Sequence, residues 1–205
     1  MRILTTVLMI IALLVEIDGA SSGEGKTGVN DEGFITTWLL IAPIPFEENQ
    51  SGTEALTKQG IKDEAALKPK AGDKVKVGVK DLVWKEYKAK DYFFDFNDFL
   101  GKETEDSVGY AVCYIHADLE MKNVRLLTGS DDQSMIYLNG KEVLKQDEDR
   151  ELEKDQDVTE VTLNKGVNVL VFKVVNEKAD WSGCARFTDK DGNVIKNIKV
   201  TTAPK

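Results

Sequence analysis

The sequence predicts an all-β fold, an antiparallel sandwich of two sheets, on three observations. After position 105, short runs rich in Val, Ile, Tyr and Phe alternate with turn residues about every 8–12 residues. Residues 108–117 (VGYAVCYIHA) are almost continuously apolar, which is typical of a strand with both faces buried. Asn139-Gly140 separates two strand-like runs and predicts a tight hairpin, because both turn positions need a positive φ.

Each predicted strand is a short apolar or β-branched run bounded by turn residues. The first (FITTWLLIAPI) ends at two prolines, which cannot continue a sheet interior. The run VNVLVFKVV indicates a core strand by its β-branched content, and the aromatic residues of 92–99 are expected to anchor one end of the core. The strands are expected over residues 34–44, 108–117, 124–128, 134–138, 141–144, 158–163, 167–175, 181–188 and 194–200.

The N-terminus has the pattern of a signal peptide, over residues 1–20. Arg2 precedes an apolar run at 3–15, and small residues follow at 19–22. That run of about 13 residues is shorter than the roughly 20 of a membrane-spanning helix, and an uncleaved anchor is the alternative. We therefore expect an exported protein, periplasmic or extracellular, that does not span a membrane after cleavage.

Composition divides the rest of the chain into a tether and one domain. Residues 21–32 are small, polar and glycine-rich and predict a flexible tether, followed by a single domain over 33–203. Within the domain we expect an ordered excursion with a short helix near 60–67 and an exposed edge strand over 73–79. Residues 146–157 are mostly charged and predict a solvated loop.

The charge of the chain excludes some classes of partner. Lys and Arg number 27 against 36 Asp and Glu, a formal net charge of -9. Nucleic acid and anionic lipid both favour clustered positive charge, so neither is an expected partner. Solubility is a sufficient explanation of the acidic balance.

The two cysteines, Cys113 and Cys184, lie in separate strand patterns. An oxidising compartment permits a disulfide that ties an early strand to a late one. The alternative is a pair of buried thiols that pack as small hydrophobic side chains.

One stretch, GSDDQSMIYLNGKEV over 129–143, resembles a known group of modules. Asp131-Asp132, the run Tyr137 to Lys141 and the later Gly166-Val167-Asn168 are similar to motifs of the galactose-binding-like jelly rolls. That group includes the sugar-binding domain of beta-galactosidase-type glycoside hydrolases and modules of secreted bacterial proteins. The resemblance implies a jelly-roll sandwich; it identifies the fold, not a ligand.

The same aspartates resemble those of the protective-antigen-type lectin domain, where adjacent aspartates hold calcium and calcium holds sugar hydroxyls. The resemblance thus implies Asp131 and Asp132 as metal or ligand contacts. Two aspartates supply too few of the six or more oxygens that calcium takes. The alternative is that both side chains cap the turn through hydrogen bonds to the backbone.

Sugar binding uses an aromatic platform for the apolar face of the ring and polar groups for its hydroxyls. Trp181 stands in a loop pattern where such a platform could be exposed, and Arg186 follows on the next strand as a partner for hydroxyls. The alternatives are a core tryptophan and an ordinary ion pair.

Nothing in the sequence predicts a catalytic site. His116 is the single histidine and lies in an apolar strand pattern, so we expect a structural role for it. No nucleophile motif or metal-ligand spacing is present, and carboxylate pairs are too numerous to be diagnostic. We expect a non-catalytic, carbohydrate-binding-like module whose partner is a polysaccharide or glycan. The alternative is a structural or adhesive module that binds another envelope protein through an edge strand or the lysine-rich segment 68–80; a hydrolase is more remote.

Overall fold

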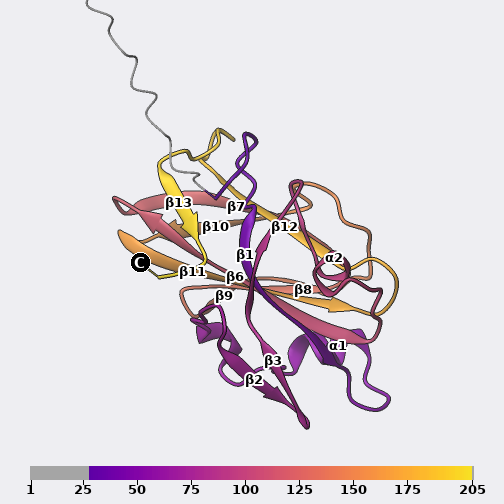
Figure 1. Cartoon of the computed structure of the whole chain (residues 1–205). Helices are drawn as coiled ribbons and strands as arrows, with labels where there is room; N and C mark the ends of the chain where they lie inside the picture. Colours follow the sequence, from indigo (N-terminus) through magenta and orange to yellow (C-terminus); the bar gives the residue numbers. More distant parts are fainter. Residues whose placement is uncertain (1–27, 205) are drawn as a thin grey trace, which may run out of the picture.

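A computed structural model describes residues 28–204 as a sandwich of two antiparallel sheets (Figure 1). The predicted signal peptide, residues 1–20, lies outside the described residues. The helical segments are α1 (Gly52–Thr57), the 3-10 turn η1 (Glu64–Ala66) and α2 (Phe96–Leu100). The strands are β1 (Thr37–Pro45), β2 (Lys74–Val77), β3 (Lys80–Val83), β4 (Lys85–Lys88), β5 (Phe94–Asp95), β6 (Ser107–Ala117), β7 (Met121–Asp131), β8 (Ser134–Leu138), β9 (Lys141–Gln146), β10 (Asp157–Leu163), β11 (Gly166–Asn176), β12 (Ser182–Thr188) and β13 (Ile198–Thr201).

The large sheet has the order β4-β1-β6-β11-β8-β9, and β13 also pairs with β6. The small sheet has the order β10-β7-β12-β5, and β2 pairs with β3 in a separate hairpin. Every pairing is antiparallel. The predicted all-β, two-sheet antiparallel sandwich is confirmed. None of the helices within residues 28–204 has the length and apolar character needed to cross a bilayer.

The position of β6 between two cores explains why its sequence is apolar at nearly every position and does not alternate. Ala111, Cys113 and Ile115 belong to the core between the two sheets, whereas Tyr110 and Tyr114 belong to a second core on the opposite face. Because side chains alternate along a strand, a strand with a core on each face needs apolar residues at every position.

The second core lies under the excursion between β1 and β4, which covers the outer face of the large sheet. Leu56, Ile61 and Trp84 pack there with residues of β1, β6, β8 and β11. The short helix expected near 60–67 is the 3-10 helix η1, and α1, which was not predicted, precedes it in the excursion. A capping box starts α1: the Ser51 side chain accepts from the Glu54 backbone, and the Glu54 carboxylate accepts from the Ser51 backbone.

A buried ion pair ties the excursion to the sheet. Lys173 of β11 is 0% exposed and Glu64 of η1 is 2% exposed. The Nζ of Lys173 lies 3.3 Å from the Oε2 of Glu64 and donates to the Leu56 carbonyl at 2.8 Å. The Tyr110 and Tyr137 hydroxyls also donate to the Glu64 carboxylate. Burial lowers the pKa of Lys173, and the Glu64 charge opposes that shift.

The hairpin that the sequence predicted at Asn139-Gly140 joins β8 to β9, with φ of 53° and 83° at its two positions. The Asn139 side chain also accepts from the Val169 backbone at 2.9 Å and donates to the Asn168 side chain at 2.8 Å. Two of the motif residues behind the family resemblance therefore hold the hairpin against β11.

The described end of the expected tether packs against the domain. The Gly28 carbonyl accepts from the Thr36 backbone at 2.9 Å, and the Glu32 carboxylate accepts from Lys154 at 2.8 Å. Residues 28–32 thus form contacts with the sandwich, although their composition predicted a flexible linker.

Candidate functional site

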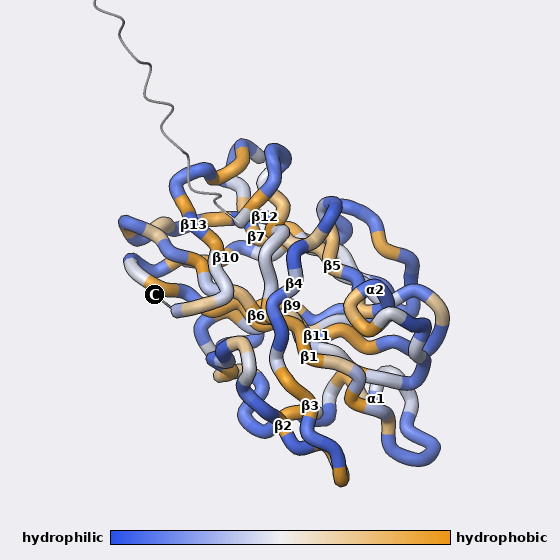
Figure 2. The backbone as a smooth tube through the Cα atoms, in the orientation of Figure 1, coloured by the Kyte–Doolittle hydropathy of each residue, from blue (hydrophilic) through white to orange (hydrophobic). Residues whose placement is uncertain are grey.

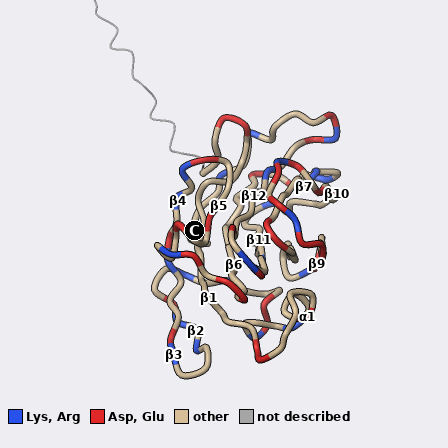
Figure 3. Tube along the Cα trace, turned by 90° about the vertical axis from the view of Figure 1, so that its right-hand side faces the viewer, with Lys and Arg blue, Asp and Glu red and all other residues tan. Residues whose placement is uncertain are grey.

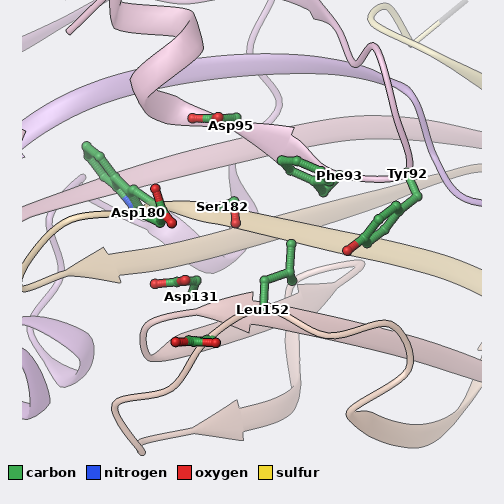
Figure 4. Close-up of a pocket in the computed structure, with 9 residues that line it drawn as sticks. Tyr92, Phe93, Asp95, Asp131, Leu152, Asp180 and Ser182 are labelled. Carbon is green, nitrogen blue, oxygen red and sulfur yellow. The ribbon is translucent and has the colours of Figure 1, made fainter. Parts of the chain in front are cut away.

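A pocket of about 290 Å³ lies at one end of the small sheet, where β7 ends and β12 begins (Figure 4). Four parts of the chain form it: the segment that leads into and includes β5, the end of β7, the loop after β9, and the turn that leads into β12. The lining residues are Tyr92, Phe93, Asp95, Asp131, Glu151, Leu152, Asp180, Trp181 and Ser182.

The register of the small sheet brings the polar lining together. Ser182 of β12 pairs with Asp131 of β7 on one side and with Asp95 of β5 on the other. On β12, Ala185 and Phe187 face the core between the sheets. Ser182 differs from them by an odd number of positions, so it points to the outer face of the small sheet, as does Asp131 opposite it.

The loop over residues 147–156 covers that outer face. Three ion pairs tie it to the rest of the domain: Arg150 with Asp157, Arg186 with Asp155, and Lys154 with Glu32. The loop backbone approaches β7 so closely that a Cβ at Gly129 would lie 2.0 Å from the Glu153 carbonyl oxygen. This segment, which follows β9 and carries many acidic positions in Figure 3, is a largely exposed loop, as predicted. Its ion pairs were not predicted, and they hold it in place as a wall of the pocket.

The pocket is strongly acidic. The lining residues, all within the described range, include four carboxylates and no Lys, Arg or His. Burial raises the pKa of Asp131 to about 6, and the charges of Asp180, Glu151 and Asp149 add to the shift, which a hydrogen bond from the Leu152 backbone opposes. Negative charge is thus concentrated here without a lining cation to balance it.

The two ends of the pocket differ in character. In Figure 4, Tyr92 and Phe93 lie at one end, Asp131 and Asp180 lie toward the other, and Leu152 lies between them. The Tyr92 and Phe93 rings are in edge contact, with centroids 5.0 Å apart. One face of the Tyr92 ring is already occupied, because the Lys154 ammonium lies 4.5 Å from its centroid.

The predicted pair of site aspartates divides between two roles. Asp131 lines the pocket. Asp132 is buried, and its carboxylate accepts from the Glu177 backbone at 2.8 Å, which is the turn-capping role given above as the alternative. Burial raises the pKa of Asp132 to about 7; a hydrogen bond from the Glu177 backbone opposes the shift, and Asp149 adds to it.

Trp181 lines the pocket but is not the exposed platform that the sequence suggested. It is 1% exposed and packs on Phe96, with ring centroids 4.5 Å apart. Its Nε1 has no hydrogen-bond partner within the described part of the chain. The prediction of an exposed ring was wrong, because α2, remote in sequence, covers the indole.

Arg186 is also placed differently from the prediction. It pairs with Asp155, donates to the Glu32 carbonyl at 3.0 Å, and lies 4.7 Å from the centroid of the Phe34 ring. It does not line the pocket. Its contacts make it an anchor of the loop, the ordinary ion pair that was the alternative interpretation.

Both cysteines are free and buried in the structure. Cys113 belongs to the core between the sheets, whereas the Cys184 Sγ lies 3.9 Å from the Glu153 carbonyl under the loop. Cys113 lies on β6 of the large sheet and faces the space between the sheets, whereas Cys184 lies on β12 and faces the outer side of the small sheet. The structure therefore has no disulfide where the sequence permitted one.

No three or more His, Cys, Asp or Glu side chains within residues 28–204 are grouped as the ligands of a metal ion. The Asp132 carboxylate accepts from the Glu177 backbone N–H, and the Asp131 carboxylate accepts from the Leu152 backbone N–H. The described residues as placed do not form a calcium cage. His116 contacts the Thr201 hydroxyl at 2.8 Å, away from the pocket.

Several lining residues were not predicted. Asp180 adjoins Trp181 in sequence, so its place in the pocket follows once that tryptophan is considered. Tyr92 and Asp95 were assigned to a core-anchoring segment, and Glu151 to a wet loop. Only the pairing of β5 with β12 and the anchored loop bring these residues together.

No protein-family model matches the chain, and no curated protein does. Among solved structures, the chain is similar to the crystal structure of the PA14 domain of MpAFP antifreeze protein, at 14% sequence identity. The match covers 83% of this chain and 90% of that one, with a TM-score of 0.41.

Proposed function

We propose that the protein is an exported, non-catalytic module that binds a carbohydrate in the pocket formed by β5, β7, β12 and the loop after β9. The observation that carries the proposal is the composition of the lining: carboxylates and a serine hydroxyl face the same space as aromatic and aliphatic side chains. Sugars have hydroxyls on their rim and apolar C–H faces, and both need partners at once.

The carboxylates can accept hydrogen bonds from several hydroxyls of one sugar. Asp180 is exposed and Asp131 is buried, so one acceptor meets the ligand at the mouth and the other in the interior. Hydrogen bonds to an ionised acceptor contribute about 1.5–3 kcal/mol each. Tyr92, Phe93 and Leu152 supply the apolar wall for the ring faces.

A glycan array followed by titration calorimetry on the best ligand tests this proposal. Asp180→Asn is expected to weaken binding at least about tenfold, because it removes one charged acceptor. Glu103→Gln, at an exposed carboxylate that does not line the pocket, is the matched control and should bind like wild type. A folded protein that binds no glycan, or equal loss in both variants, would contradict the proposal.

A second candidate, docking to another envelope protein, is favoured by the β2–β3 hairpin. The hairpin projects from the sandwich, and its tip is hydrophobic (Figure 2). Val79 at the turn is 96% exposed, and the neighbouring Lys74, Lys76 and Lys80 are exposed as well. Val75, Val77 and Leu82 pack on the second core, so only the opposite face of the hairpin is open to a partner.

The two candidates separate in a capture experiment with an envelope extract. If the hairpin is the binding surface, Val79→Asp abolishes capture and Asp180→Asn does not. If the pocket is the site, Asp180→Asn abolishes capture and Val79→Asp does not. Free glycan then competes with the captured material for the protein.

A further inference from the structure

We infer that the ligand of this pocket carries a positive charge and, given the carbohydrate proposal on which the inference rests, that it is an amino sugar with a free, unacetylated amine. The charge of the lining selects among carbohydrates, because it favours a positively charged sugar over a neutral or an acidic one.

The negative charge of the pocket lining is not balanced by a cation among the described lining residues. Asp95, Asp131, Glu151 and Asp180 all line the pocket, and the described lining contains no cationic side chain. Three cations lie nearby, Arg150, Lys154 and Arg186, and each is paired with a carboxylate outside the lining. A neutral sugar would leave the mutual repulsion of these carboxylates in place, whereas an ammonium group relieves it on binding.

The hydrogen-bond donors of an amine match the acceptors of the pocket lining. An ammonium group has three N–H donors and no acceptor, and ionised carboxylates have acceptors only. Charge-assisted bonds of this kind are roughly twice as strong as neutral ones. In Figure 4 the Asp131, Asp180 and Ser182 side chains face a shared space, which is the position we assign to the amine.

The remaining lining favours a sugar over a simple polyamine. Tyr92 and Phe93 lie away from the acidic end and suit the apolar face of a sugar ring, which a simple polyamine lacks. Trp181 is 1% exposed and its side chain belongs to the core between the sheets, so we assign it no contact with the ligand. Uronic and other acidic sugars are excluded by the same charge.

The test compares two oligosaccharides that differ only in acetylation: a glucosamine oligomer with free amines and its N-acetylated counterpart. Calorimetry of the wild-type protein should give at least about tenfold tighter binding to the free amine, and raised salt should weaken that preference. Asp131→Asn and Asp180→Asn should each reduce the preference, while Glu103→Gln should retain it. Circular dichroism and thermal melting of each variant show that it is folded.

The other outcomes separate the two proposals. Equal or tighter binding of the acetylated oligomer in the pocket would overturn the inference and leave the carbohydrate proposal standing. If spermidine, a cation without a sugar ring, binds as tightly as the glucosamine oligomer, the result would support a positively charged ligand and contradict the proposal that the ligand is a sugar. If calcium chloride raises the melting temperature of wild type but not of Asp131→Asn, and no amine binds, the pocket takes a metal ion and the inference is wrong.

Discussion

The Nζ of Lys173 lies 3.3 Å from the Oε2 of Glu64, and both side chains are shut off from solvent. One belongs to a central strand of the large sheet and the other to a one-turn helix in the excursion. Removal of one partner leaves a buried, uncompensated charge, so the pair decides whether the excursion stays on the sheet.

Lys173→Met is expected to lower the free energy of unfolding by about 3–5 kcal/mol, the usual cost of breaking a buried ion pair. The double variant Lys173→Met with Glu64→Leu should recover much of that loss, since neither charge is then left unpaired. Chemical denaturation measures both. Lys74→Met is the control, because Lys74 is exposed and 3.7 Å from Asp81, and its effect should stay within about 1 kcal/mol. A single variant as stable as wild type would contradict this role.

Stability should fall as pH rises through the raised pKa values of the site. Asp131 and Asp132 titrate at about 6 and about 7 in the folded protein, above the ordinary value of 3.8. Between the ordinary and the raised values the folded state holds more protons than the unfolded state, so the free energy of unfolding decreases with pH. One such group contributes a slope of at most about 1.4 kcal/mol per pH unit.

Asp131→Asn removes one of these titrating groups, so the free energy of unfolding should decrease less steeply with pH than in the wild-type protein. Urea denaturation of both proteins from about pH 5 to about pH 8 measures it. Parallel curves for the two proteins, or a wild-type stability that increases over this range, would show that Asp131 does not titrate as described.

Gly129→Ala tests whether the loop wall shapes the pocket. The new Cβ would lie 2.0 Å from the Glu153 carbonyl oxygen, so the backbone of the loop has to move. Overpacking of this kind costs about 1–3 kcal/mol. Because Glu151 and Leu152 belong to the same loop, glycan binding should fall together with the melting temperature. Unchanged values of both would contradict the close approach.

The two thiols should be reduced and unreactive in the folded protein. Burial raises the pKa of Cys184 to about 12 and raises that of Cys113 well above its ordinary value, so little thiolate is present at neutral pH. The intact mass should be the same with and without reductant, and alkylation should label both cysteines only after denaturation. A mass that shifts on reduction would show a bridge that the structure lacks.

Local patterns sufficed for the strands and failed for the contacts between them. The β8 strand and the Asn139-Gly140 turn follow from a short, mostly apolar run and from turn chemistry alone, and the structure agrees. The Ser51–Glu54 capping box was present in the sequence and marks the start of α1. The ion pair in the second core could not be predicted, because nothing local in the strand around Lys173 indicates that a distant Glu64 balances its charge.

The candidate site shows the same limit. Asp131 could be singled out because it ends a strand within a distinctive motif, but its separation from Asp132 depends on strand alternation at the end of β7. Trp181 has the local sequence of an exposed loop residue, and Phe96, 85 positions earlier, buries it. Trp181→Ala is accordingly a poor probe of binding, since loss of a buried tryptophan costs about 3–5 kcal/mol of stability by itself.

The central claim is that ligands bind in the pocket at the end of the small sheet. Backbone chemical-shift mapping by NMR, with the tightest glycan titrated into labelled protein, tests it most directly. The account predicts that the largest shifts occur at Asp131, Asp180 and Ser182 and in the loop over 150–153. Shifts confined to the hairpin over 74–83, or scattered over the surface, would contradict it.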